Sequence, residues 1–245
     1  MKNIKMTLQY DGSRYLGWQR LKNNDKTIQG KIENVISQMV EEDIQIIGSG
    51  RTDAGVHSYG QVANFITTFN LSLKEMQEYI NHYLPNDIVV SHIEEMDERF
   101  HSRYNVKSKV YEYKIWIGKY QSPFHRKYSW HYNKRLNVPL MKEAAELIIG
   151  THDFIGFSSL KKQKKSTVRT IEKIDFKVSD DLLEIQILGD GFLHNMVRII
   201  IGTLVQIGSG EIDKKIISEV LQNKVRAEAG ITAPPHGLFL KKINY

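Results

Sequence analysis

The stretch Gly48–His57 holds the residues whose types and spacing are best suited to chemistry. It reads GSGRTDAGVH and places the carboxylate of Asp53 between Arg51 and the imidazole of His57. Glycines in a loop let a ligand or another backbone come close. A phosphate-binding P-loop needs Lys followed by Ser or Thr after its last glycine, and a dinucleotide-binding loop needs G-x-G-x-x-G at the start of a helix. The stretch fits neither pattern, so we interpret it as a glycine-rich loop built around a carboxylate.

Asp53 has three interpretations from chemistry alone. Aspartate in a loop commonly hydrogen-bonds its own backbone in a turn. Asp53 and His57 are both metal-ligand types, but two ligands are too few for a metal site and the sequence offers no obvious third. The third interpretation is a catalytic carboxylate that acts on a sugar or a base.

Arg198 lies in an apolar segment that we expect to form a largely buried helix, Phe192–Ile207. A buried arginine needs an anionic partner, because an isolated buried charge is very costly. The partner is either a structural glutamate or a carboxylate in a cleft, which the pairing would keep ionised. The residues themselves do not choose between these two partners. The segment has one polar stripe, formed by His194, Asn195, Arg198, Gly202 and Gln206.

Aromatic residues accompany these charged groups. The segment VYEYKIWI at 110–117 alternates like a strand and places Tyr111 and Tyr113 on one face. Such tyrosines are ordinarily part of a core, but RNA-binding sheets also use aromatic side chains as platforms for bases. Trp18, in YLGWQR, has the same two interpretations.

Positive charge is concentrated in one segment, and the net charge of the whole chain is only +6. The chain carries 34 Lys and Arg against 28 Asp and Glu, a surplus too small to identify a partner. The segment KKQKKSTVR reads as an exposed loop, which is either simply solvated or suited to a polyanion. Its basic residues are Lys161, Lys162, Lys164, Lys165 and Arg169.

Length and composition indicate a protein that folds without covalent staples. A chain of 245 residues has room for one large or two small domains, and it has no cysteine, which excludes disulfides and thiolate metal sites. The N-terminus has no signal-peptide pattern, and the longest apolar region is too short and too polar to span a bilayer. We expect a soluble, cytoplasmic protein.

Hydrophobic periodicity predicts an α+β protein with a mixed or antiparallel sheet and helices on one face. Strand–helix–strand order occurs in both halves, and the expected junction is HSRYNVKSK at 101–109. The predicted strands are 5–10, 44–50, 61–68, 88–96, 110–117, 168–178, 182–188 and 237–243, and the predicted helices are 28–39, 71–83, 140–148, 192–207 and 212–221.

Six segments together resemble the TruA-type tRNA pseudouridine synthase family. They lie in the family's order and cover nearly the whole chain. They are YDGSRYLGWQ with TIQGKIE (9–33), GSGRTDAGVHSYGQVANF (48–65), RFHSRYNVKSKVYEYKI (99–115), KSTVRTI (165–171), GDGFLHNMVRIIIG (189–202) and AGITAPPHGLFL (229–240).

The resemblance implies a function and a role for each site residue. It implies an isomerase that converts uridine to pseudouridine at positions 38, 39 and 40 of the tRNA anticodon stem-loop. Asp53 falls on the family's catalytic aspartate, and Tyr111 falls on the tyrosine that packs against the target base. Arg198 falls on the basic residue paired with the aspartate, and Arg51 on the arginine implicated in displacing the target nucleotide.

The resemblance also implies an architecture. It predicts two α/β-sandwich-like halves, 1–104 and 105–245, with a continuous sheet and the active cleft between them. It further implies a homodimer with tRNA as its partner and neither cofactor nor metal. The chain departs from the family at FHSRYNV, at Val110 before Tyr111, and in its lysine-rich segment. These departures leave the chemistry unaltered and leave the choice of tRNA open.

Two other functions fit some of the same residues. A non-catalytic RNA-binding protein or RNA-folding aid needs the basic surface but does not need Asp53. A glycoside hydrolase normally needs two carboxylates that flank the scissile bond, and the loop contains one.

Overall fold

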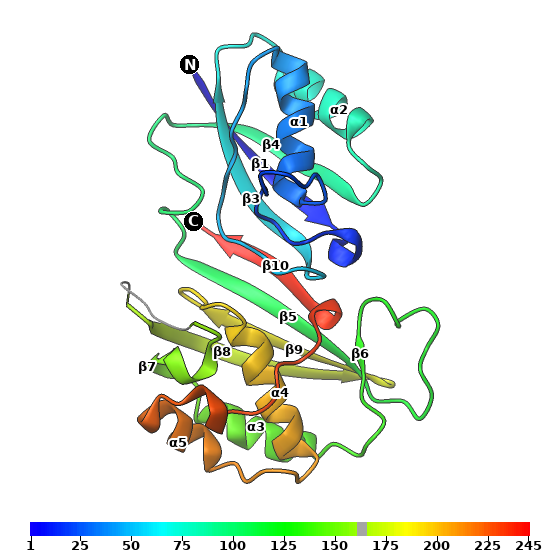
Figure 1. Ribbon diagram of the computed structural model, residues 1–245, viewed down its shortest axis with the longest axis vertical. Coiled ribbons are helices and arrows are strands. Elements are labelled where there is room, and N and C mark those ends of the chain that lie inside the picture. The colour runs from blue at the N-terminus through cyan, green and yellow to red at the C-terminus, as the bar shows by residue number, and fades with distance from the viewer. Residues whose placement is uncertain (161–165) are drawn as a thin grey trace. The chain divides into compact units, whose positions relative to one another are not determined.

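The computed structural model describes residues 1–160 and 166–245, which form two compact units (Figure 1). Unit 1 contains Met1–Lys107 and Phe239–Tyr245, and unit 2 contains Ser108–Leu238. Each unit combines a sheet with helices, so the predicted α+β class is confirmed. The division into functional halves 1–104 and 105–245, with a cleft between them, stays a prediction. No helix in the described ranges has the length and apolarity needed to cross a membrane.

The sheet of unit 1 has the strand order β4-β1-β3-β10, with β2 also paired to β3. β1 is antiparallel to β3 and β4, whereas β10 is parallel to β3 and places Phe239 opposite His57. This pairing explains why the end of the chain belongs to unit 1. The elements are β1 (Lys2–Tyr10), α1 (Ile28–Val40), β2 (Ile47–Gly48), β3 (His57–Thr67), α2 (Leu73–Tyr83), β4 (Ile88–Met96) and β10 (Leu238–Asn244), with a short 3₁₀ helix, η1 (Gly12–Arg14), after β1.

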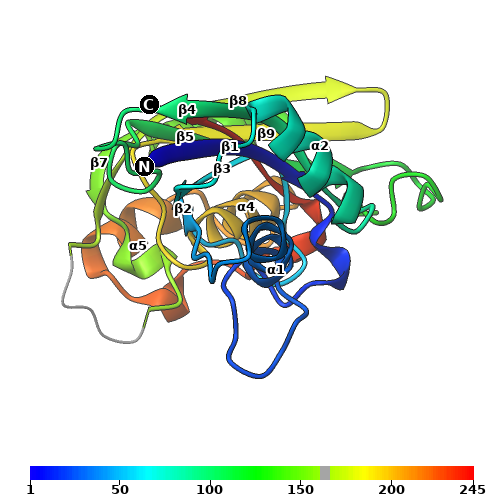
Figure 2. The ribbon, with the colours of Figure 1, turned by 90° about the horizontal axis from the view of Figure 1, so that it is seen from above.

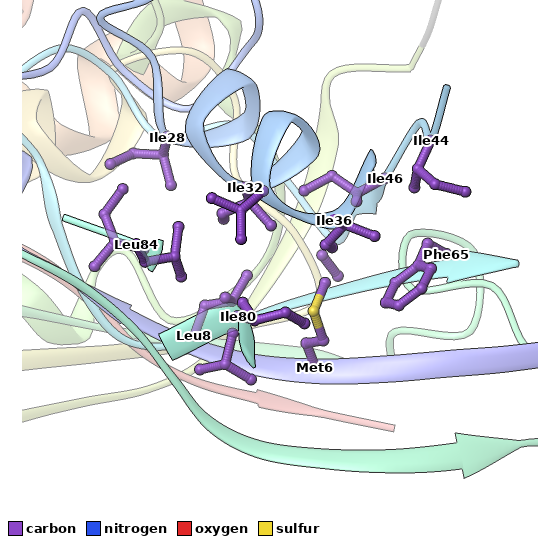
Figure 3. Packing of buried hydrophobic residues seen from close by; sticks show 14 of the residues in the cluster. Met6, Leu8, Ile28, Ile32, Ile36, Ile44, Ile46, Phe65, Ile80 and Leu84 are labelled. Atoms are coloured by element: carbon purple, nitrogen blue, oxygen red, sulfur yellow. The ribbon is translucent and has the colours of Figure 1, made fainter. Parts of the chain in front are cut away.

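The core of unit 1 follows from two periodicities. Alternate residues of β1 point to one face of the sheet, while residues three and four apart on α1 form one helix face. The two sets meet, together with Ile80 of α2 (Figure 3). The side chain of Thr27 caps α1 by accepting from the N–H of Gly30. The fully buried side chains in this contact include Ile4, Met6, Leu8, Ile28, Ile32 and Ile36.

Unit 2 has an antiparallel sheet of order β5-β9-β8-β7, and β6 pairs in parallel with β5. Helices α4 and α5 lie on one side of strands β8 and β9 (Figure 2). The elements are β5 (Ser108–Trp116), β6 (Trp130–His131), α3 (Val138–Glu146), β7 (Gly150–Asp153), β8 (Val168–Ser179), β9 (Leu182–Gly189), α4 (Met196–Gly208) and α5 (Ile216–Asn223), with 3₁₀ helices η2 (Phe154–Phe157), η3 (Arg226–Glu228) and η4 (Pro235–Gly237).

Helix α4 begins later than the sequence predicts. The expected helix started at Phe192, but Asn195 has a φ of 60° and the helix begins at Met196. The left-handed backbone at Asn195 interrupts the helical path, so His194 and Asn195 precede the helix instead of extending its polar stripe. The rest of α4 is almost entirely buried, as expected.

Residues 97–105, which we call the 97–105 turn, are tied to the sheet of unit 1 by buried amides. Asn3 donates from its side-chain amide to the carbonyls of Asp97 (3.0 Å) and Phe100 (2.8 Å). Asn64 donates to the Asn3 side chain (2.8 Å) and accepts from the N–H of Ser102 (3.0 Å). Because Asn3 and Asn64 are 2% and 1% exposed, these bonds are shielded from water.

Replacing Asn64 by leucine tests this connection. Asn64→Leu keeps the branched shape of the side chain but leaves the side-chain oxygen of Asn3 and the N–H of Ser102 without their partner, so we expect a loss of about 1–3 kcal/mol of unfolding free energy for each group. Urea unfolding measures the loss. Asn34→Leu is the matched control, because Asn34 is exposed on α1 and its change is expected within about 0.5 kcal/mol. Equal stability of the two variants would contradict a structural role for the Asn64 amide.

Candidate active site

Ser49–Val56, which we call the Asp53 loop, connects β2 to β3 and is held at its start by Gln61. The fully buried amide of Gln61 accepts from the hydroxyl of Ser49 (2.6 Å) and donates to the carbonyl of Gly50 (3.0 Å). The N–H of Ser49 donates to the carbonyl of Val62 (2.8 Å). Since these groups are shielded from water, the loop leaves the sheet in a fixed direction.

The middle of the loop is fixed by the segment that follows β1. The N–H of Trp18 donates to the carbonyl of Thr52 (3.0 Å), and the hydroxyls of Tyr10 and Thr52 are 2.8 Å apart. Burial raises the pKa of Tyr10, so this phenol stays neutral at physiological pH. Thr52, the residue before Asp53, is therefore hydrogen-bonded through both its backbone carbonyl and its side-chain hydroxyl.

Glycines permit the close approach of the segment Gly12–Trp18 to the loop. A Cβ on Gly12 would lie 2.0 Å from the carbonyl oxygen of Val56. Gly17 has a φ of +103°, and a Cβ there would lie 2.7 Å from the carbonyl oxygen of Thr52 and 3.2 Å from the carbonyl carbon of Asp53. No other residue type fits these positions without displacing the loop.

Asp53 is half-buried, its neighbour Thr52 is buried, and Arg51 is exposed. The turn that follows is closed by the backbone, because the carbonyl of Asp53 accepts from the N–H of Val56 (3.2 Å). This turn bond is made by the backbone carbonyl of Asp53. Arg51 and Asp53 thus belong to the same loop, but Arg51 is exposed to solvent and Asp53 is half-buried.

His57 has a structural role that sequence reasoning missed. It is 1% exposed, stacks on Phe239 with ring centroids 4.7 Å apart, and its Nδ1 accepts from the N–H of Gly12 (3.1 Å). Asp11 Oδ1 is also 3.1 Å from Nδ1, but a nitrogen that accepts from Gly12 carries no proton to donate to Asp11. We therefore assign the hydrogen bond to Gly12.

The described residues offer no metal centre. In residues 1–160 and 166–245, no group of three or more His, Cys, Asp or Glu side chains is arranged to hold a metal ion. Within unit 1, the contacts of His57 connect the loop to the start of η1 and to β10.

Unit 2 gathers a second set of predicted residues around Arg198 on α4. Its guanidinium donates to the carbonyl of Ala233 (2.7 Å) and to the side-chain oxygen of Asn195 (2.8 Å). The left-handed Asn195 is therefore one of the groups that orient Arg198. The hydroxyl of Tyr113 donates to the carbonyl of Pro234 (2.7 Å), which fixes the chain between Ala233 and β10.

Electrostatics around Arg198 favour neutral neighbours. Burial raises the pKa of Tyr113, and the charge of Arg198 partly opposes that shift. Burial lowers the pKa of His236, and the charge of Arg198 acts in the same direction. Both groups are uncharged at pH 7, so Arg198 is the cation of this cluster.

Tyr111 and Tyr113 differ although the sequence places them on one face of β5. Tyr113 is fully buried, whereas Tyr111 is half-buried and packs edge-on against Phe192 with ring centroids 5.0 Å apart. Trp18 is 2% exposed and is thus mainly a core residue.

Of the basic residues in the lysine-rich segment, only Arg169 lies within the described part of the chain. Arg169 on β8 donates to the carbonyls of Ser166 (3.0 Å) and Val168 (2.6 Å). Lys161, Lys162, Lys164 and Lys165 lie outside the described residues. The predicted pairing of Asp53 with Arg198 involves both units and stays a prediction, as do the roles of Tyr111 and Arg51.

Comparison with known proteins identifies the class. A family model described as tRNA pseudouridine synthase matches residues 6–105 and 144–245. "tRNA pseudouridine synthase A 2" of Bacillus cereus and "tRNA pseudouridine synthase A 1" of Clostridium tetani are each 49% identical over 245 residues, covering 100% of both chains. "tRNA pseudouridine synthase A" of a Thermoanaerobacter species is 42% identical with the same coverage.

A chain of a crystallised Cbf5–Nop10–Gar1 complex aligns with a TM-score of 0.35 and 9% identity, over 83% of this chain and 44% of that one. That similarity is too low to support an inference. The family match and the full-length relatives are sufficient: the chain belongs to the tRNA pseudouridine synthase family. The predicted family and the predicted enzyme class, an isomerase, are thereby confirmed.

Gly17→Ala tests whether the glycine contact positions the Asp53 loop. The added Cβ requires a backbone conformation costing roughly 1–3 kcal/mol and also collides with Thr52. We expect both lower stability and a loss of pseudouridine formation of about 100-fold, since a misplacement of about 1 Å has that effect.

Gly210→Ala is the matched control for that experiment. Gly210 has a φ of +78°, and a Cβ at this position would meet nothing within 4 Å, so this variant carries the backbone strain without a collision. It should lose stability and keep its turnover when assayed well below its melting temperature. Equal turnover by the two variants would contradict the positioning role of Gly17.

Proposed function

We propose that this protein converts uridine to pseudouridine in tRNA, at positions 38, 39 and 40 of the anticodon stem-loop, with Asp53 as the catalytic carboxylate. The observation that carries the proposal is the Asp53 loop, in which glycine contacts and buried hydrogen bonds hold one half-buried carboxylate beside an exposed arginine. The full-length relatives, all named for tRNA pseudouridine synthesis, support the choice of substrate.

The reaction breaks the bond between ribose C1′ and base N1, turns the base, and joins C1′ to base C5. C5 loses one proton and N1 gains one, so the isomerisation is redox-neutral and is proposed to need no cofactor. The carboxylate of Asp53 adds to C1′, adds to the base, or removes a sugar proton to give a glycal. Each route requires Asp53 to be ionised and close to the nucleoside.

The other site residues receive roles that suit their positions. From the family resemblance, Arg198 is proposed to pair with Asp53. Tyr111 packs against the target base. A uridine stacked in a stem must first leave the stack, which costs a few kcal/mol, and the exposed Arg51 displaces it.

We propose from the family resemblance that the enzyme acts as a homodimer in the cytoplasm. The lysine-rich segment and Arg169 are proposed to contact the RNA backbone, since polyanion binding depends on such concentrated charge. A monomeric mass by light scattering at working concentration would contradict the dimer.

Asp53→Asn tests the proposed chemistry. The variant keeps the size of the side chain and removes its charge and nucleophilic oxygen, so we expect turnover on unmodified tRNA to fall by about 10⁴–10⁶-fold while tRNA binding persists. Pseudouridine mapping and filter binding provide the measurements. Asp213→Asn, at an exposed loop position, is the matched control and should match the wild type. Multiple turnover by a folded Asp53→Asn protein would exclude this mechanism.

Salt dependence tests the lysine-rich segment. Changing Lys161, Lys162, Lys164 and Lys165 to alanine should weaken tRNA binding and reduce the slope of log K against log salt by about 0.7–0.9 for each phosphate that is no longer bound. Titrations between low and physiological salt measure the slope. An unchanged slope would show that the segment is only solvated.

A further inference from the structure

A cavity lies beside the Asp53 loop, within unit 1. It has a volume of about 250 Å³, and Trp18, Gly48, Gly50 and Arg51 form one side of it. The other side comes from His101, Arg103 and Tyr104 of the 97–105 turn. Asp53 does not line this cavity. The cavity lining therefore excludes the carboxylate, whereas Arg51 belongs both to the cavity lining and to the Asp53 loop.

The lining has the chemistry of a nucleotide site. Arg51 and Arg103 provide two guanidinium groups, and among the described residues neither forms an ion pair with a carboxylate. No aspartate or glutamate of the described chain lines the cavity. Two cations in a lining that contains no acid favour an anion such as a phosphate.

Tyr104 supplies an aromatic face at the mouth of the cavity. It is 77% exposed, and its ring lies 4.2 Å from that of His101 at an interplanar angle of 32°. An exposed aromatic on a fixed turn provides a stacking surface for any base, because every base has a π-face. The Nδ1 of His101 accepts from the N–H groups of Arg103 (3.1 Å) and Tyr104 (3.3 Å), so His101 organises both residues.

Both walls of the cavity are preorganised. The 97–105 turn is held by the buried amides of Asn3 and Asn64. Behind the opposite wall, the buried carboxylate of Glu33 accepts from the N–H of Ile46 (2.9 Å) and from the amide of Gln29 (2.8 Å). Its second oxygen is 3.0 Å from the guanidinium of Arg20, an ion pair that is close but not aligned as a hydrogen bond. Because both walls are already held in place, little conformational entropy is lost when a ligand binds.

We propose that this cavity binds one unpaired nucleotide of the substrate RNA other than the uridine that reacts, with its base on Tyr104 and its phosphate between Arg51 and Arg103. The inference rests on the proposed function and extends it. In this proposal Arg51 has two roles, because it displaces the reacting uridine and also binds the phosphate of this second nucleotide.

The test combines protein variants with RNA variants. The full-length protein is titrated with tRNAs that each carry one abasic nucleotide at an unpaired position of the anticodon stem-loop. We expect Tyr104→Ala to weaken binding of intact tRNA by roughly 5- to 150-fold, the range of one base-stacking contact. One abasic tRNA should weaken binding to the wild type by a similar factor and should not weaken binding to Tyr104→Ala any further. Tyr104→Phe should bind like the wild type.

Two matched controls separate the cavity from general charge and aromatic content. Arg103→Gln should weaken binding more than Arg99→Gln, because both arginines are exposed but only Arg103 lines the cavity. Tyr83→Ala removes a tyrosine that is 55% exposed elsewhere in unit 1 and should leave binding unchanged. Wild-type affinity of Tyr104→Ala, or independent losses at every abasic position, would overturn the inference.

The same samples keep the two proposals distinct. Pseudouridine formation by the wild type tests the proposed function, whatever the abasic titrations show. Uridine 5′-monophosphate is titrated as the free-nucleotide probe. If it binds the wild type but not Tyr104→Ala while no abasic tRNA couples to Tyr104, the occupant is a free nucleotide and the RNA proposal is wrong.

Discussion

The close approach of one backbone segment to another is the constraint on which the proposed site depends. The segment Gly12–Trp18 lies against the Asp53 loop at distances that exclude side chains at Gly12 and Gly17. Trp18 and Tyr10 bond Thr52, so the backbone that carries the half-buried Asp53 is held against the sheet of unit 1. The same loop carries Arg51 outward, so one rigid element serves both the proposed chemistry and the adjacent cavity.

Much of the fold could be predicted because its long elements are strongly periodic. The strand 88–96 was predicted with the bounds of β4, and the α+β class followed from alternating and helical spacing. Local geometry explains where the elements expected from the sequence differ from those in the structure. The start of α4 depends on the left-handed Asn195, which no apolar pattern reveals. The edge strands β6 and β7 have two and four residues, too few for alternation to be recognised.

The site could be predicted where residue types are unusual, as at Asp53 inside a glycine-rich loop. It could not be predicted where function depends on distant partners. His57 drew attention in the sequence only as a residue of metal-ligand type beside Asp53, and its Nδ1 accepts from the backbone N–H of Gly12. Asn64 and Glu33 support the site through buried bonds to residues far along the chain, and a single sequence carries no signal for such pairs. Family resemblance assigned roles to Arg198 and Tyr111, and these roles stay predictions.

In the proposed reaction, this protein isomerises uridine within tRNA without releasing the base. The most direct measurement incubates the wild-type protein with unmodified tRNA, maps pseudouridine at each nucleotide, and assays free uracil in the same sample. We expect conversion at positions 38, 39 or 40 wherever uridine occurs there, with no free uracil. Release of uracil together with abasic tRNA would instead indicate a glycosidase, and binding without conversion would indicate a non-catalytic RNA-binding protein.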